Sequence, residues 1–201
     1  MRELFIVTGP MRSGKTTFCK KLFALLEAGS LRPFAIVEEN LRDLGGIPVS
    51  LSLHDLGADE ERPLASRAGS VPGSGSEFPY PPFRFSEPAF SWAWDRAKAA
   101  VEKGCGPVLV DEIGPLEADE GKGFFPTVAW LLDHGDCPLL VTMRPGLEKA
   151  FLDRLSGSGE RSLDGAAIFH CEADREEPQT VAAEIFRHCQ DRKGAVYYSH
   201  R

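Results

Sequence analysis

The sequence has no surplus of positive charge, no long apolar run and no paired cysteine motif. Its formal net charge is −7, so we expect no binding to nucleic acid. No apolar stretch approaches the ~18 residues that a membrane-spanning helix needs, so we expect no membrane partner. The five cysteines form no Cys-x-x-Cys pair, which indicates buried or free thiols in a reducing compartment. The apolar run that ends at Thr8 is too short for a signal peptide, so the sequence predicts a cytoplasmic protein.

The chain of 201 residues has a length typical of one α/β domain, and we predict a single domain over residues 1–201. Apolar runs of strand length alternate with segments of helical periodicity. This alternation predicts a mostly parallel sheet with helices on both faces. The predicted strands cover residues 4–8, 34–38, 49–54, 108–112, 139–143 and 166–171. The predicted helices cover residues 15–27, a segment that begins after Ser86, residues 124–134, a short segment after Pro145, and residues 178–190.

One stretch, from about residue 58 to residue 82, is rich in Gly, Ser, Pro and charge. Residues of these types favour turns and irregular backbone over regular elements. We therefore predict a surface connecting loop there. A lid that closes over a ligand is the alternative interpretation of the same stretch.

Residues 9–16 read GPMRSGKT and fit the pattern G-x-x-x-x-G-K-[ST] at every fixed position, between a predicted strand and a predicted helix. Glycine at positions 9 and 14 lets the backbone come close to phosphate groups, and the N–H groups of the loop and the helix start attract anions. In such a loop Lys15 reaches the β- and γ-phosphates and the Thr16 hydroxyl binds Mg²⁺. We predict a nucleoside triphosphate site formed by Gly9, Pro10, Met11, Arg12, Ser13, Gly14, Lys15, Thr16 and Thr17.

A second motif ends a predicted buried strand, where residues 108–112 read VLVDE. An acidic residue at the carboxyl end of such a strand is the other half of a phosphate-loop site, so we predict that Asp111 holds Mg²⁺ together with Thr16. Glu112 is then placed to polarise an attacking water as a general base. A base of this kind favours hydrolysis over transfer to another substrate. The alternative for Glu112 is a solvated loop residue.

Arg144 follows another predicted core strand, at the sheet edge where the phosphate loop lies. Its guanidinium would stabilise charge that develops on the γ-phosphate, and we predict a catalytic role for it beside Lys15 and Glu112. A surface arginine next to a helix start is the alternative.

The run DEIGPLE at residues 111–117 resembles the D-E-I-G-x-x-E signature of the P-loop nucleoside-triphosphatase family that includes the cancer-related nucleoside-triphosphatase of animals. The segments at 38–42 and 173–175 are similar to others of that family. The resemblance covers most of the chain and implies a RecA-like three-layer α/β/α sandwich. It also implies Mg²⁺-dependent hydrolysis of ATP, GTP and other triphosphates to diphosphates, with loose base specificity. It places the base near Asp174 and Arg175, and we predict that Arg175 stacks on the ring.

Two other functions stay open from the sequence. A small nucleotide or metabolite kinase would pass the γ-phosphate to an acceptor, and Arg154 and Arg161 could belong to the lid that a kinase uses to exclude water. A nucleotide-dependent switch that binds a protein partner is the third candidate. The sequence shows no Asn-Lys-x-Asp segment, which such switches use to recognise a base.

Overall fold

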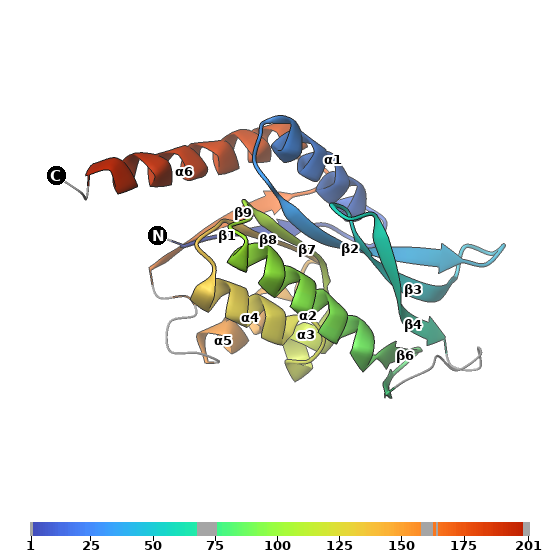
Figure 1. The fold of residues 1–201 in the computed structure, drawn as a ribbon. Helices are drawn as coiled ribbons and strands as arrows, with labels where there is room; N and C mark the ends of the chain where they lie inside the picture. The colour runs from blue at the N-terminus through green and yellow to red at the C-terminus, as the bar shows by residue number, and fades with distance from the viewer. Residues whose placement is uncertain (1, 68–75, 158–162, 164, 199–201) are drawn as a thin grey trace.

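The computed structural model describes residues 2–67, 76–157, 163 and 165–198. Strands and helices alternate along most of the chain (Figure 1). The elements are β1 (Arg2–Thr8), α1 (Lys15–Ala28), β2 (Phe34–Arg42), β3 (Pro48–Asp55), β4 (Glu60–Arg67), β5 (Glu77–Tyr80), β6 (Phe83–Ser86), α2 (Glu87–Glu102), β7 (Val108–Ile113), α3 (Pro115–Glu120), α4 (Phe125–His134), β8 (Leu139–Met143), α5 (Glu148–Ser156), β9 (Ala166–Glu172) and α6 (Pro178–Tyr198).

All nine of these strands form one sheet in the order β5-β6-β4-β3-β2-β7-β8-β1-β9. Strands β2, β7, β8, β1 and β9 are parallel, whereas β3, β4, β6 and β5 continue the sheet beyond β2 by antiparallel pairing. The parallel half places β1 between β8 and β9, so the loop after β1 lies at the carboxyl edge of the sheet with a neighbour on each side. The α/β fold with a parallel nucleus is confirmed.

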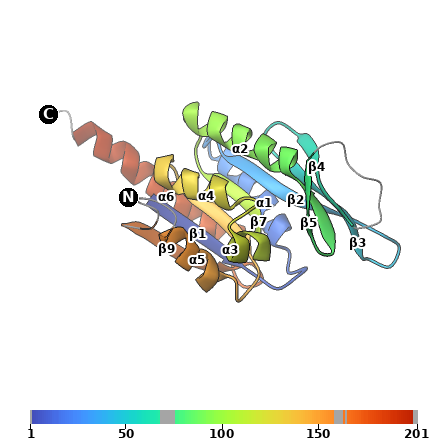
Figure 2. The same ribbon diagram turned by 90° about the horizontal axis from the view of Figure 1, so that it is seen from below.

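Helices cover the parallel strands on both faces, which gives three layers (Figures 1 and 2). Strand β1 shows the cause, because its buried side chains alternate between two cores. Leu4 and Ile6 pack in the core that includes α2, α4 and α5, while Phe5 and Val7 pack with α1 and α6. A strand with both faces buried reads as one apolar run, as the sequence indicated.

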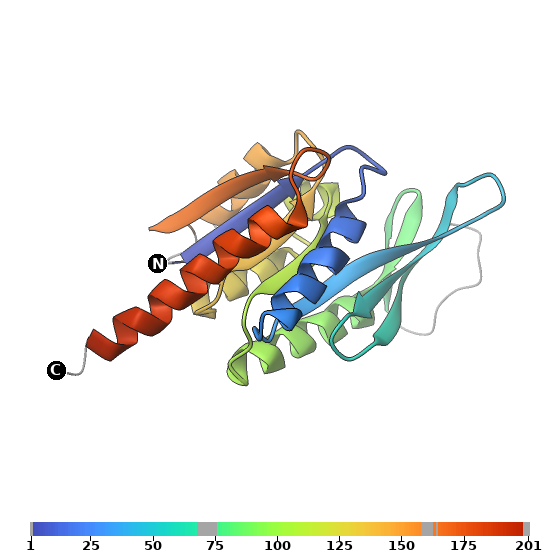
Figure 3. The same ribbon diagram turned by 90° about the horizontal axis from the view of Figure 1, so that it is seen from above.

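The antiparallel hairpins project past the layer that α1 and α6 form (Figure 3). Helix α2 follows directly on this extension. It begins after Ser86, whose hydroxyl accepts a hydrogen bond from the Ala89 amide at 3.3 Å, and it buries Ala89, Ala93 and Ala97 along one side. The extension is therefore tied to the helical layer as well as to β2.

Three expectations need correction. The stretch from about residue 58 to residue 82 is not a connecting loop throughout, because β4 and β5 occupy residues 60–67 and 77–80; residues 68–75 lie outside the described part of the chain. Helix α3, directly after β7, was not expected. Helix α6 continues to residue 198. Even so, none of the helices in the described residues is long and apolar enough to cross a membrane.

Candidate functional site

The loop after β1 has the backbone that its two glycines permit. Gly14 has a φ of 92°, a left-handed conformation that side chains disfavour. A Cβ on Gly9 would come within 2.3 Å of the Ser13 hydroxyl oxygen, so a larger residue at position 9 would require the Ser13 side chain to shift. The loop turns tightly and leads straight into α1.

The first turn of α1 has no side-chain cap. The amide groups at a helix start need acceptors, and an uncapped start attracts anions. Lys15 begins the helix and is 5% exposed. Its Nζ donates to the carbonyl oxygens of Gly9 at 3.1 Å and Pro10 at 3.4 Å, so the ammonium lies over the loop.

Asp111 lies below this loop at the end of β7 and is fully buried. Its carboxylate accepts a hydrogen bond from the Thr16 hydroxyl at 2.7 Å and another from the Thr142 hydroxyl. Burial raises the pKa of Asp111 to about 6, against the opposing effect of these two hydrogen bonds. Two motifs 95 positions apart therefore meet at one point.

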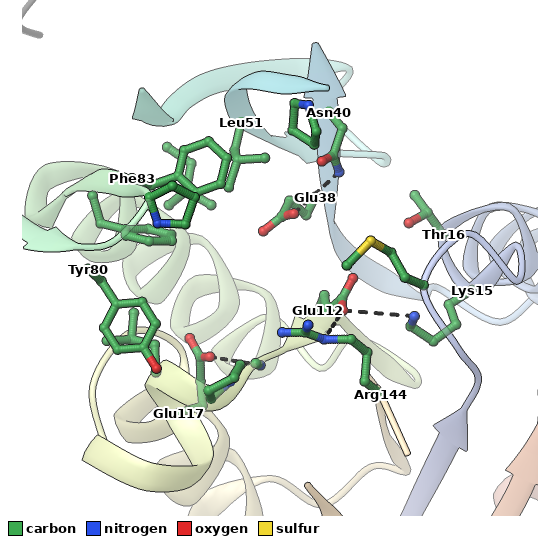
Figure 4. A pocket seen from close by; sticks show the side chains of 18 of the residues that line it. Lys15, Thr16, Glu38, Asn40, Leu51, Tyr80, Phe83, Glu112, Glu117 and Arg144 are labelled. Atoms are coloured by element: carbon green, nitrogen blue, oxygen red, sulfur yellow. Dashed lines mark hydrogen bonds and ion pairs between the residues drawn. The ribbon is translucent and has the colours of Figure 1, made fainter. Parts of the chain in front are cut away.

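Glu112 points to the other side, between two cations. Its Oε1 lies 3.8 Å from Lys15 Nζ and 3.7 Å from Arg144 Nε. Both distances exceed hydrogen-bond range, so the carboxylate still has lone pairs to offer to a water. Figure 4 shows Glu112 and Arg144 facing each other, with Lys15 beside them. The three side chains predicted to be catalytic thus lie together.

Two buried side-chain polar atoms in the described part of the chain lack a hydrogen-bond partner, and both belong to this site. They are the hydroxyl oxygen of Ser13, in the loop, and Nε of Arg144. Burying a polar atom without a partner costs about 1–3 kcal/mol. Of the two, Arg144 lines the cavity in front of the loop, so its Nε can donate to a polar ligand there.

A cavity of about 850 Å³ opens in front of the loop. On the loop side it is lined by Met11, Arg12, Gly14, Lys15, Thr16 and Thr17, with Glu112 and Arg144 next to them. On the opposite side apolar residues of the sheet extension and the helical layer line it, as Figure 4 shows for Leu51, Tyr80 and Phe83. The volume is within the range of roughly 300–1,000 Å³ that small-molecule sites have.

Two further carboxyl groups face this cavity, Glu38 on β2 and Glu117 on α3. Burial, followed by the charges of Glu112, Asp111 and Glu117, raises the pKa of Glu38 to about 8. Glu117 accepts hydrogen bonds from the amides of Gly114 at 2.9 Å and Phe124 at 3.0 Å. The sequence resemblance pointed to both segments, but no role was predicted for either side chain.

Three arginines are engaged by other groups of the protein. Arg175 pairs with Glu172 at 2.9 Å, is 74% exposed and lines a separate depression, which Thr8 of β1 and Glu148 of α5 also line. Arg12 reaches across to the Gly46 carbonyl at 2.9 Å. Arg154 donates to the Ala118 carbonyl at 3.0 Å, so it ties α5 to α3 and does not form a lid. The other lid candidate, Arg161, lies outside the described residues.

The donor set at Thr16 and Asp111 fits Mg²⁺. Hydroxyl and carboxylate oxygens are hard ligands, and Mg²⁺ in nucleotide sites uses one or two of them and keeps several waters. Elsewhere in the described chain no group of three or more His, Cys, Asp or Glu side chains could hold a metal ion.

Comparison with known proteins adds three findings. A family model described as NTPase matches residues 4–164. The solution structure of a human cancer-related nucleoside triphosphatase has a TM-score of 0.64 and 18% identity, covering 95% of this chain and 98% of that one. The crystal structure of THEP1 from the hyperthermophile Aquifex aeolicus has a TM-score of 0.59 and 16% identity, covering 92% and 96%. At these identities the two structures show the fold. No curated protein sequence matches the chain.

Proposed function

The chain belongs to the NTPase family and is a nucleoside-triphosphatase; on that premise we propose that it hydrolyses nucleoside 5′-triphosphates to diphosphate and phosphate at the loop of residues 9–17. The observation that carries the proposal is the convergence of Lys15, Asp111, Glu112 and Arg144 around the uncapped start of α1. Mg²⁺ is the proposed cofactor, held by Thr16 and Asp111; when bound it neutralises charge on the β- and γ-phosphates.

In this proposal the loop binds through its backbone, and Lys15 adds the charge that selects the β- and γ-phosphates. Arg144 approaches from β8, and its Nε has no other hydrogen-bond partner. A guanidinium there stabilises the charge that grows on the γ-phosphate in the transition state. Both cations already lie within 4 Å of Glu112. A water molecule held by Glu112 and a γ-phosphate held by the two cations would therefore lie next to each other.

Glu112 is the proposed general base. Its carboxylate accepts a proton from a water molecule and directs the oxygen at the γ-phosphorus. Asp111 is unsuited to this step because both of its oxygens already accept hydrogen bonds from threonine hydroxyls. In this proposal Asp111 therefore binds the metal ion and Glu112 activates the water.

The base of the nucleotide is proposed to lie on the β9 side, near Asp174 and Arg175. Ala173 is close to the loop, since its Cβ would be 3.4 Å from a Cβ on Gly9. Arg175 is exposed there and can stack on any base, because stacking uses the ring face and not its hydrogen-bonding edge. Loose base specificity follows.

A kinase stays the second candidate, because the cavity beyond Arg144 has room for an acceptor. The arrangement of Arg154 argues against it, since that side chain is engaged with α3. A kinase needs a way to keep water from the γ-phosphate, and Glu112 at the same point would instead activate water.

The test is phosphate release from ATP, GTP, CTP and UTP, each with Mg²⁺, with EDTA, and with candidate acceptors such as nucleosides. We expect acceptor-independent release that requires Mg²⁺ and varies by less than about tenfold among the bases, or roughly 1.4 kcal/mol. Lys15→Ala should remove it, as the control for a contaminating phosphatase. Consumption that depends on an acceptor would support the kinase, and a strong preference for one base would reject stacking by Arg175.

A further inference from the structure

The cavity extends well beyond the phosphate loop, and its far part is aromatic. Rings from β6, from α2 and from the residue before α4 line it in a continuous series. The centroids of Phe83 and Phe85 are 6.2 Å apart, those of Phe85 and Phe90 6.0 Å, and those of Phe90 and Phe124 5.3 Å. Tyr80 joins them at 6.4 Å from Phe85. We call this set of five residues the aromatic wall. Such rings offer faces and edges on which another ring packs.

The strand order separates the aromatic wall from the place proposed for the nucleoside. The loop after β1 has β9 on one side and β8, β7 and β2 on the other. Glu112 and Arg144, which mark the γ-phosphate end, lie on the β7 and β8 side, and the cavity continues from them toward β3, β4 and β6. A nucleoside that leaves the loop toward β9 points away from the aromatic wall, so this part of the cavity has space for another molecule.

Two arginines at the wall offer partners to an anion, although desolvation and then the charges of Glu120, Asp119 and Glu117 raise the pKa of Tyr80. Arg67, on β4, lines the cavity and has no ion-pair partner among the described residues; it is paired in register with Phe83. Arg42 also lines the cavity, with one nitrogen bonded to the Gly46 carbonyl. Three of the carboxylates nearby are engaged: both oxygens of Glu117 accept amide hydrogen bonds, Glu112 lies between two cations, and Glu120 pairs with Lys122 at 2.7 Å. Burial, followed by the charges of Glu112, Asp111 and Glu117, raises the pKa of Glu38 to about 8, which lessens its repulsion of an anion.

We propose that the aromatic wall and Arg67 form a second ligand site, which binds a planar apolar ring compound with one negatively charged group while a triphosphate occupies the loop. The site goes beyond hydrolysis of the triphosphate, and it rests on the proposed placement of the nucleoside toward β9. Its ligand would contact the rings by stacking and Arg67 by charge, and would lie next to Glu112 and Arg144.

A suitable probe is 8-anilinonaphthalene-1-sulfonate, an aromatic anion whose fluorescence rises on binding to apolar sites. With the full chain we expect one saturable site per molecule, and the same site in the presence of saturating Mg²⁺ and a non-hydrolysable triphosphate analogue. Phe83→Ala and Arg67→Gln should each weaken the probe about tenfold, the loss expected for one ring or charge contact. Equal thermal unfolding midpoints would show that these variants are folded.

Two matched variants serve as controls. Leu44→Ala removes a fully exposed apolar side chain that does not line the cavity, and Arg62→Gln removes a charge from the same strand, where Arg62 lies over Trp92. Both should leave probe affinity unchanged. Displacement of the probe by the triphosphate analogue would overturn the proposal, because the wall would then hold the substrate's own base. Absence of saturation, or equal effects in all four variants, would overturn it too. Lys15→Ala should lose hydrolysis but still bind the probe. The proposed hydrolysis and the proposed second site can therefore fail independently of each other.

Discussion

Arg144 is proposed to stabilise the charge that develops on the γ-phosphate. Its Nε is buried without a hydrogen-bond partner, and the guanidinium faces the cavity beside Glu112. We expect Arg144→Ala to lower the turnover number by roughly 10²–10³-fold, as loss of one group that stabilises developing charge does. Triphosphate affinity should change little, because the loop and Lys15 supply it.

The measurement is steady-state hydrolysis together with direct binding of a non-hydrolysable triphosphate analogue. Arg187→Ala is the matched control, since Arg187 is an exposed arginine of α6 that pairs with Glu184; its turnover number should equal that of the wild type. Equal losses of affinity and turnover in Arg144→Ala would contradict a role confined to the transition state.

The residues of the phosphate loop were predictable from sequence because their chemistry is local: Gly9, Lys15 and Thr16 act through one continuous turn and helix start. Glu38 and the aromatic wall were not, because they reach the cavity only when β2, β6, α2 and α4 are assembled. Arg175 follows β9 and lines a separate depression; its contact with the base is a proposal, since a loop's position does not fix the direction of a long side chain.

Among the helices and strands, β4 explains why the sequence was misread between residues 58 and 82. Only Leu64 and Ala65 of this strand are buried, so it shows no alternating pattern. Pro63 lies within it, opposite Ser52 on β3. A proline removes one amide donor, but β6 pairs only with residues 65–67 on the other side of β4, so that donor is not needed. Residues 60–67 therefore form a strand because they pair with β3 and β6, and not because of their own β-propensity.

Helix α3 depends on Glu117, whose carboxylate joins the amide of Gly114 at its start to that of Phe124 before α4. Glu117→Gln keeps the shape but turns an NH₂ group toward one of these amides. We expect the free energy of unfolding to fall by roughly 1–3 kcal/mol, the cost of a buried donor left unpaired. Urea unfolding measures it, with Glu120→Gln, an exposed residue of the same helix, as a near-neutral control.

The pH dependence of this deficit is a second readout. Burial raises the pKa of Glu117 to about 7 from 4.5, so the folded protein holds this proton more tightly than the unfolded chain. Its contribution to stability is complete below about 4.5 and is lost as pH rises through about 7. The glutamine variant lacks this loss, so the difference between the two proteins should narrow over that interval. A difference that is constant or widens would contradict the assignment.

The whole molecule combines a parallel half of the sheet with an antiparallel extension. The alternation of strands and helices in the sequence predicted the parallel half but not the extension. The nucleus supplies the loop, Asp111, Glu112 and Arg144. The extension and α2 supply most of the opposite wall of the cavity. The proposed hydrolytic site therefore follows from the geometry of parallel strands, whose carboxyl ends meet at one edge, whereas the cavity's far side depends on strand pairings that no local pattern encodes.

The proposed mechanism rests on Glu112 as the base, and Glu112→Gln tests it. The substitution keeps the size and hydrogen-bonding reach of the side chain and removes its charge. Binding of the Mg²⁺–triphosphate and single-turnover hydrolysis should be measured on the same preparation, with Glu39→Gln, outside the cavity lining, as the control. We expect binding to be kept and hydrolysis to fall by roughly 10²–10⁴-fold, the contribution of a general base. Hydrolysis at the wild-type rate with binding kept would contradict the account, because water would then be activated by another group.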